Sequence, residues 1–145
     1  MIRFLFLFLV SFSVYADLPI SPNPNLTPGS FDSSVTIKQI CTPGRAKKAR
    51  KVSLSKKKKV FVAYHIDPNS SKFEIDHLIP LSLGGSNNVD NLWPQSYLTS
   101  PYNAYDKDKL ETKFHAMVCS GKLELKTARE KIAKDWIKAD KEYIE

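Results

Sequence analysis

The densest group of polar side chains in the sequence lies between residues 74 and 91. Asp76 and His77 are adjacent, and Asn91 follows His77 after 14 positions. A neutral imidazole with an ordinary pKa can take a proton from water near neutral pH. A carboxylate is an oxygen ligand that Mg²⁺ accepts, and a bound cation can act as a Lewis acid on a phosphodiester. These residues could therefore form a metal-bearing active site. The alternatives are that they form a polar turn and that His77 is a structural histidine.

The residues around this group predict a β-hairpin that would hold it. Residues 73–76 alternate apolar and acidic side chains, as a half-buried strand does, and residues 89–93 alternate again. Between them we expect Gly84 and Gly85 to serve a turn that needs positive φ. Because neighbouring side chains of a strand point to opposite faces, Asp76 and His77 converge only if the strand ends or bends there.

Helices are predicted on both sides of the hairpin. Apolar side chains opposite lysines over residues 55–64 indicate a short helix. Ser100 and Pro101 are suited to begin a second helix, which Gly121 would end. Amphipathic spacing from Leu125 to Tyr143 predicts the last helix. This order predicts an α+β fold in which a small antiparallel β-hairpin is followed by a helix packed with additional helices.

The charge of the chain favours a polyanionic partner. The formal net charge is +7, and residues 45–59 hold nine Lys or Arg with no acid among them. Such a run is often a solvated face or a flexible arm, and it could attract an anionic membrane surface. Its position before the polar group favours nucleic acid. The side chains that we expect to contact phosphates are Arg45, Lys47, Lys48, Arg50, Lys51 and Lys107.

The first residues have the organisation of a secretory signal peptide. In residues 1–16, Arg3 precedes an apolar run that is too short to span a bilayer, and small residues lie at Val14 and Ala16. A membrane anchor or a buried strand is the alternative. We therefore expect an exported protein, periplasmic or secreted, without stable membrane association after cleavage. Proline-rich residues 17–40 predict an extended, poorly ordered leader. We expect residues 41–145 to form the folded domain.

Two cysteines, Cys41 and Cys119, are the only ones in the sequence. In an oxidising compartment two lone cysteines most often pair, so we expect a disulfide between them. The alternative is a pair of free buried thiols. The sequence contains no C-x-x-C pair, which argues against a zinc ribbon.

The segment that begins at Asp76 resembles the ββα-metal motif of the HNH, or His-Me finger, endonucleases. The resemblance is carried by a helix after Asn91 and by the residues Asp76-His77, Pro80, Gly84-Gly85 and Asn91-Leu92. More narrowly, the stretches DHLIPLSLGGSNNVDNLWPQ, KDKLE and VCSGK resemble small secreted HNH nucleases of bacteria. This narrower resemblance extends over about residues 41–136.

The resemblance implies a role for each matching residue. His77 would be the general base that activates water, and Asp76 would be a metal ligand. Asn91 would tie the two strands together by side-chain hydrogen bonds and so orient His77. The implied cofactor is a divalent metal, with Mg²⁺ favoured over Mn²⁺ or Zn²⁺.

At the third position the sequence departs from the motif. The position roughly nine residues after Asn91 is Ser100, which is a poor ligand. We choose Asn103, in the first turn of the predicted helix, as the second metal ligand. His115 is the competitor, although it lies about 18 Å farther along the helix.

Two functions remain open at this point. The first is a secreted, metal-dependent HNH endonuclease that acts on DNA in preference to RNA, with low sequence specificity and as a monomer. The second is a non-catalytic basic module that binds nucleic acid and keeps the ββα scaffold. A weaker third interpretation is a structural metal site of His65, His77 and His115, whose spacings fit no tight ligand pattern.

Overall fold

The computed structural model describes residues 21–145, so the predicted signal peptide lies outside the described residues. It contains five helices, two 3₁₀ turns and two strands. In chain order these are α1 Ile37–Ile40, α2 Arg45–Ala49, α3 Leu54–Ala63, β1 Phe73–His77, η1 Leu81–Leu83, η2 Val89–Asn91, β2 Leu92–Ser96, α4 Ala104–Cys119 and α5 Leu125–Tyr143. The predicted α+β fold is confirmed, because one antiparallel hairpin is followed by two packed helices.

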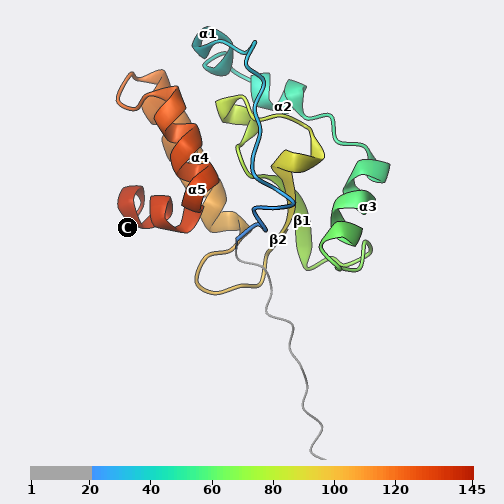
Figure 1. Cartoon of the computed structure of the whole chain (residues 1–145). Coiled ribbons are helices and arrows are strands. Elements are labelled where there is room, and N and C mark those ends of the chain that lie inside the picture. Colours follow the sequence, from blue (N-terminus) through green and yellow to red (C-terminus); the bar gives the residue numbers. More distant parts are fainter. Residues whose placement is uncertain (1–20) are drawn as a thin grey trace, which may run out of the picture.

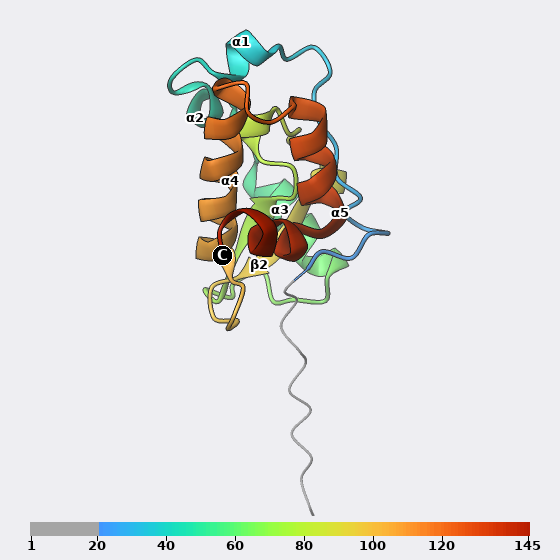
Figure 2. The ribbon, with the colours of Figure 1, turned by 90° about the vertical axis from the view of Figure 1, so that its left-hand side faces the viewer.

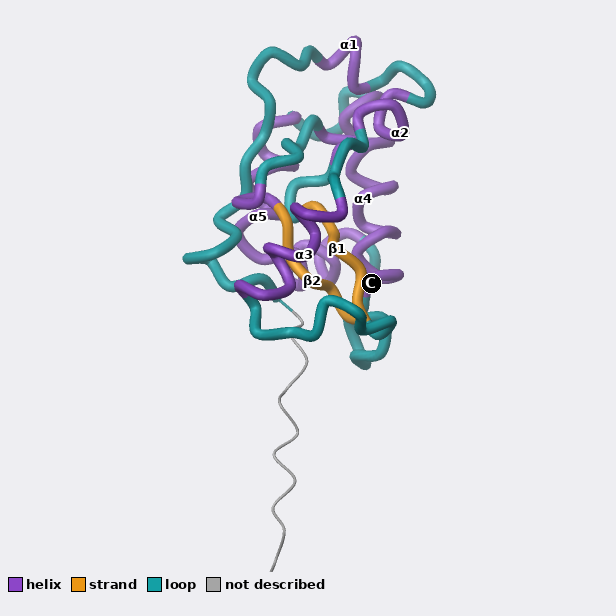
Figure 3. Tube along the Cα trace, turned by 90° about the vertical axis from the view of Figure 1, so that its right-hand side faces the viewer, coloured by secondary structure: helices purple, strands orange, loops and turns teal. Residues whose placement is uncertain are grey.

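The hairpin lies between two helical layers. Strand β1 pairs antiparallel with β2, and His77 lies opposite Leu92. On one face, Ile75 and Leu92 pack against Val60 and Phe61 of α3. Helices α4 and α5 lie on the other side of the hairpin (Figures 1 and 2). Figure 3 shows the two short strands in orange between α3 and α4.

The larger core joins α4 and α5 to the loop after β1. Apolar side chains at helical spacing bring the two helices together, as the sequence pattern predicted. Phe114 of α4 is fully buried there, and truncating such a side chain to alanine typically costs about 3–5 kcal/mol. The buried members of this core are Ile79, Leu83, Leu110, Phe114, Val118, Ala128, Ile132, Trp136 and Ala139.

Helix α4 begins later than predicted. Asn103 is its N-cap, and its side chain accepts a hydrogen bond from the Tyr105 N–H. The Asp106 carboxylate in turn accepts from the Asn103 N–H, which completes a capping box. The prediction of a start at Ser100 and Pro101 is therefore wrong, because the stronger reciprocal cap lies three residues farther along the chain.

The second strand also begins later than predicted. Residues Val89–Asn91 form the turn η2, and β2 starts at Leu92. The apolar and polar alternation of residues 89–93 therefore spans a turn and a strand. Asn91 lies at their junction, where its side chain bonds to the loop that follows β1.

Within the predicted leader, residues 17–20 lie outside the described residues, and residues 23–31 contact the hairpin and the loop between its strands. Thr27 is buried, and its hydroxyl donates to the Leu92 carbonyl at 2.9 Å. Phe31 forms a bridge with Gly85, and α1 follows. The segment runs along the hairpin toward α1 in Figure 1. Its prolines fit an extended course, while its backbone and hydroxyl groups supply the contacts.

The predicted disulfide is confirmed. Cys41, which follows α1, is bonded to Cys119 at the end of α4. A disulfide is consistent with an oxidising, extracytoplasmic location. Within residues 21–145, none of the helices has the length and apolar character needed to cross a membrane.

Candidate functional site

His77 is held at the end of β1 by the loop residue Asn87. The Nε2 atom of His77 lies 3.1 Å from Asn87 Oδ1. The Asn87 amide is oriented by two further contacts, because its Nδ2 donates to the Ala49 carbonyl at 2.8 Å and its Oδ1 accepts from the Lys51 N–H at 3.3 Å. An oxygen therefore faces the ring, so Nε2 carries the hydrogen. The lone pair of the neutral ring is on Nδ1.

The surroundings of His77 favour its neutral form. The residue is only 2% exposed. Burial lowers the pKa of His77 below its ordinary value, and nearby Arg50 acts in the same direction. The hydrogen bond with Asn87 and the negative charge of Asp76 oppose this shift without reversing it. A buried imidazole with a lowered pKa is available as a base at neutral pH.

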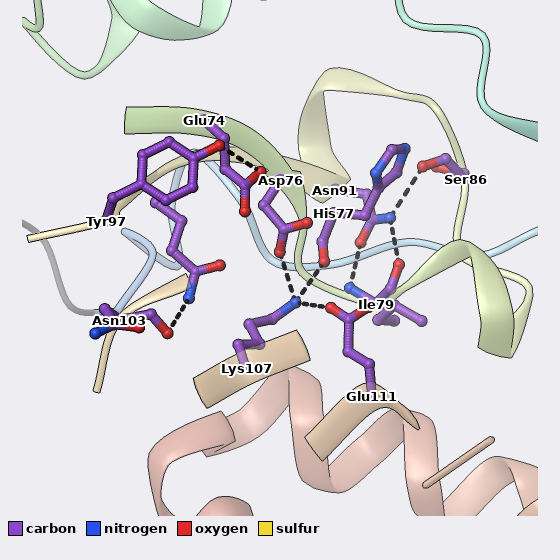
Figure 4. A network of polar contacts seen from close by, with 11 residues as sticks. Glu74, Asp76, His77, Ile79, Ser86, Asn91, Tyr97, Asn103, Lys107 and Glu111 are labelled. Carbon is purple, nitrogen blue, oxygen red and sulfur yellow. Dashed lines mark hydrogen bonds and ion pairs between the residues drawn. The ribbon is translucent and has the colours of Figure 1, made fainter. Parts of the chain in front are cut away.

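Asn91 makes the bracing contacts that were predicted, but it braces a loop. Its Nδ2 donates to the carbonyls of Ile79 and Ser86, both at 2.9 Å, and its Oδ1 accepts from the Ile79 N–H at 2.9 Å. The same oxygen accepts from the Ser30 N–H at 3.2 Å. Figure 4 shows the contacts with Ile79 and Ser86. Since Ile79 lies two residues after His77, the brace fixes the backbone where β1 ends.

The glycine pair serves two different needs. Gly84 has φ +80°, as the prediction of a turn requires. Gly85 has no positive φ, and it is needed because the chain approaches closely. A Cβ at Gly85 would lie 1.7 Å from the Ile79 carbonyl oxygen. That oxygen is the one that Asn91 binds, so the glycine makes room for the brace.

Asp76 points away from His77, toward α4. Its Oδ2 accepts from Lys107 Nζ at 2.7 Å. The same ammonium donates to the His77 carbonyl at 2.8 Å and to Glu111 Oε1 at 2.5 Å. In Figure 4 the Asp76 carboxylate and the Glu111 side chain both face the Lys107 ammonium. Asp76 and His77 therefore keep the alternation of the strand and do not converge on one point.

The prediction that Lys107 contacts a phosphate is wrong. Lys107 is 0% exposed, because α4 places it against the hairpin. Burial by itself would lower the pKa of Lys107, but Asp76 and Glu111 outweigh this effect and raise it. Burial also raises the pKa of Glu111, and Lys107 opposes that shift. The lysine stays charged and is enclosed by its acceptors.

The predicted metal ligands are not brought together. The Asn103 Oδ1 accepts from the Tyr105 N–H at 3.0 Å, and its Nδ2 donates to the Thr99 carbonyl at 3.3 Å. Both polar atoms of the side chain are thus used at the start of α4, while Asp76 is bound to Lys107. Asp76 and Asn103 do not fit as a metal-ligand pair.

The histidines offer no substitute for this pair. His115 Nε2 lies 3.1 Å from the Ile40 carbonyl oxygen, beside the disulfide. His65 is exposed after α3, and His77 contacts Asn87. In the described part of the chain, no group of three or more His, Cys, Asp or Glu side chains is arranged to hold a metal ion. The interpretation of a three-histidine metal site is therefore wrong.

The basic segment is attached to the loop that carries Asn87. Arg45 is partly used by the fold, since its Nη1 donates to the Leu81 carbonyl at 2.8 Å. Lys56 Nζ donates to the Asn87 carbonyl at 2.5 Å. Arg50 lies between the two residues that orient the Asn87 amide. The exposed cationic side chains among those predicted are Lys47, Lys48, Arg50 and Lys51.

Sequence reasoning missed Asn87 and Glu111. Asn87 lies in a polar loop where an asparagine usually serves a turn, and its partners Ala49 and Lys51 are remote in the sequence. Glu111 lies one helical turn after Lys107, a spacing typical of an ordinary surface ion pair.

No family model, curated protein or solved structure matches the chain. The function of the site is therefore proposed from its own geometry together with the resemblance of its residues to the ββα-metal motif.

Proposed function

We propose that the chain is an exported, HNH-like endonuclease that hydrolyses phosphodiester bonds in nucleic acid. His77 is the base that activates water. Asn91 braces the backbone at the end of β1, as the resemblance to the ββα-metal motif implies. The order of hairpin and helix α4 supports the same motif. We propose DNA as the preferred substrate, with RNA second.

The contact between His77 and Asn87 carries this proposal. The Asn87 amide binds the His77 ring and also the backbone on both sides of Arg50. One side chain thereby joins a buried base to a segment of exposed cations. A base beside cations suits phosphodiester hydrolysis, because the cations can bind the phosphate and the base can act on the water beside it.

The proton transfers follow from the tautomer of His77. Water loses a proton to Nδ1 as its oxygen attacks phosphorus, and the ring becomes an imidazolium with Nε2–H held by Asn87. The bond from phosphorus to the leaving oxygen breaks, and that oxygen takes a proton from solvent. A bound divalent metal would supply a Lewis acid at the phosphate, but Asp76 and Asn103 do not fit as its ligands. No step is assigned to a metal.

The basic segment supports low sequence specificity. Contacts from lysine and arginine to phosphates carry no direct information about bases. We propose that the protein acts as a monomer in the periplasm or outside the cell. The disulfide between Cys41 and Cys119 supports an oxidising compartment.

The contacts of Asp76 favour a second candidate function. Its carboxylate is bound to the Lys107 ammonium, which removes the metal ligand that the HNH resemblance implies. A non-catalytic, nucleic-acid-binding module that keeps the ββα scaffold would need no such ligand. In that case the exposed cations bind phosphates and His77 is a buried structural residue.

Cleavage of supercoiled plasmid by the purified, oxidised protein separates the two functions. Mg²⁺, Mn²⁺, Zn²⁺ and a chelator are tested in parallel, with His77→Ala beside wild type. Loss of a general base costs about 10²–10⁴-fold in rate. His65→Ala is the matched control, since His65 is exposed and lies elsewhere. Equal cleavage by His77→Ala would overturn the mechanism. Salt-sensitive binding without cleavage under any condition would favour the binding module.

A further inference from the structure

The Lys107 ammonium is enclosed by three oxygen acceptors. These are the Asp76 carboxylate, the His77 carbonyl and the Glu111 carboxylate, at 2.7, 2.8 and 2.5 Å from Nζ. An ammonium has three N–H donors, so each donor has one partner. The lysine side chain is almost wholly buried, and those of Asp76 and Glu111 are 11% and 18% exposed. The ammonium is therefore fixed in position.

The three acceptors are also the oxygen types that a hard divalent cation binds. Carboxylate and backbone carbonyl oxygens are ligands that Mg²⁺ and Ca²⁺ accept. In this chain a side-chain cation lies among them, between β1 and α4. Its charge satisfies the two carboxylates, which would otherwise be buried together without a counter-ion.

We infer that Lys107 is a built-in cation that takes the place of a divalent metal beside Asp76. Asp76 and Glu111 are then acceptors for the lysine in the native protein and do not bind metal ions. Lys107 is a positioning residue, because it touches the His77 carbonyl and joins the end of β1 to α4. This inference does not rest on the proposed hydrolysis, since it concerns binding alone.

Removing the ammonium should convert the position into a metal site. Lys107→Ala would leave Asp76, Glu111 and the His77 carbonyl facing a space that a hydrated cation could enter. Lys107→Met would remove the charge but keep most of the volume, so the space would stay closed. The two variants separate the effect of removing the charge from the effect of opening a space for the cation.

Mn²⁺ binding tests the inference on the full, oxidised protein. Mn²⁺ is titrated into each variant and followed by the loss of the free-ion electron paramagnetic resonance signal, with folding checked by circular dichroism. The panel is wild type, Asp76→Asn, Glu111→Gln, Lys107→Ala, Lys107→Met and Lys107→Ala with Asp76→Asn. Lys113→Ala is the control, because Lys113 is an exposed lysine of the same helix.

We expect Lys107→Ala to gain one Mn²⁺ site that Asp76→Asn removes. Wild type, Lys107→Met and Lys113→Ala should lack it. The inference is overturned if folded wild type binds Mn²⁺ at a site that is lost in folded Asp76→Asn or Glu111→Gln. It is also overturned if folded Lys107→Ala gains no site. If Lys107→Ala does not fold, wild type compared with Glu111→Gln still decides whether the native acceptors bind metal.

Discussion

Nε2 of His77 lies 3.1 Å from Oδ1 of Asn87, and the amide of Asn87 is anchored on the basic segment. Asn87 therefore does two things at once. It selects the Nε2–H tautomer of the ring, and it keeps the cations of residues 45–51 beside the base. A change at Asn87 should affect the histidine itself as well as any activity.

Asn87→Leu should remove the preference for the Nε2–H tautomer. Losing one hydrogen bond of about 1.4 kcal/mol to the reacting ring would slow hydrolysis about tenfold. Asn87→Asp should instead raise the pKa of His77, because a carboxylate then faces Nε2. Long-range ¹H–¹⁵N spectra of the imidazole report both the tautomer and the pKa. Asn88→Asp is the control for charge, since Asn88 is the exposed neighbour. An unchanged tautomer in Asn87→Leu would contradict the assignment.

The lowered pKa of His77 predicts a pH dependence of stability. In the unfolded chain His77 has its ordinary pKa of 6.5, while burial lowers it in the folded protein. Between these values the unfolded chain binds more protons, so the free energy of unfolding rises with pH there. Stability should fall as pH drops below 6.5 toward the native pKa. Urea denaturation from pH 8 to pH 5 measures this.

His77→Gln should flatten that part of the profile, and His65→Gln is the control, because His65 is exposed and lies elsewhere in the fold. Any hydrolytic activity that uses His77 as a base should also rise with pH in this range. His77 remains neutral to a pH below 6.5, so the acidic limb of the rate profile should lie below that value. A profile that His77→Gln does not alter would rule out His77 as its origin.

The elements with a regular local pattern could be predicted from the sequence. Residues 73–76 and 125–143 alternate or repeat with the period of their element, and the structure has β1 and α5 there, although non-helical backbone at Asp135 interrupts α5. The brace at Asn91 and the disulfide could also be predicted, the first from the motif and the second from the cysteine count. The signal in each case lies within a short stretch or in the composition.

The partners of Asp76 could not be predicted in this way. Which residue of α4 faces β1 depends on where that helix begins, and the Asn103–Asp106 capping box moves the start beyond the predicted position. That start places Lys107 against Asp76. Asn87 shows the same limit, because its partners Ala49 and Lys51 are brought to it by the packing of the basic segment.

Asn91→Ala should destabilise the fold strongly. Asn91 is fully buried and satisfies backbone groups of Ile79, Ser86 and Ser30. Leaving several buried groups without partners costs about 1–3 kcal/mol each, so a total loss of at least about 3 kcal/mol is expected. Urea denaturation measures the loss. Asn88→Ala is the matched control, and a similar midpoint for both variants would show that the brace contributes little.

Removing the disulfide should destabilise the protein as well. Cys41 and Cys119 are 78 positions apart, and closing a loop of that size stabilises by about 4–5 kcal/mol on the chain-entropy model. The double variant Cys41→Ser with Cys119→Ser should lose a comparable free energy of unfolding. Denaturation of wild type with and without reductant gives an independent measurement. Equal denaturation midpoints in all these samples would show that the disulfide does not contribute to the free energy of unfolding.

Charge reversal in the basic segment should weaken nucleic-acid binding. Lys47 and Lys48 are exposed in α2, near the backbone that Asn87 anchors. The double variant Lys47→Glu with Lys48→Glu should bind duplex DNA more weakly at low salt. Each lost phosphate contact should also reduce the slope of log K against log salt by about 0.9. Fluorescence anisotropy of a labelled duplex, read across a salt series, measures both quantities.

The control variant Lys134→Glu with Lys138→Glu reverses two exposed charges on α5 instead, and so makes the same change in net charge. If both double variants lose affinity equally, binding depends on net charge alone, whereas a larger loss at Lys47 and Lys48 places the phosphate contacts beside His77.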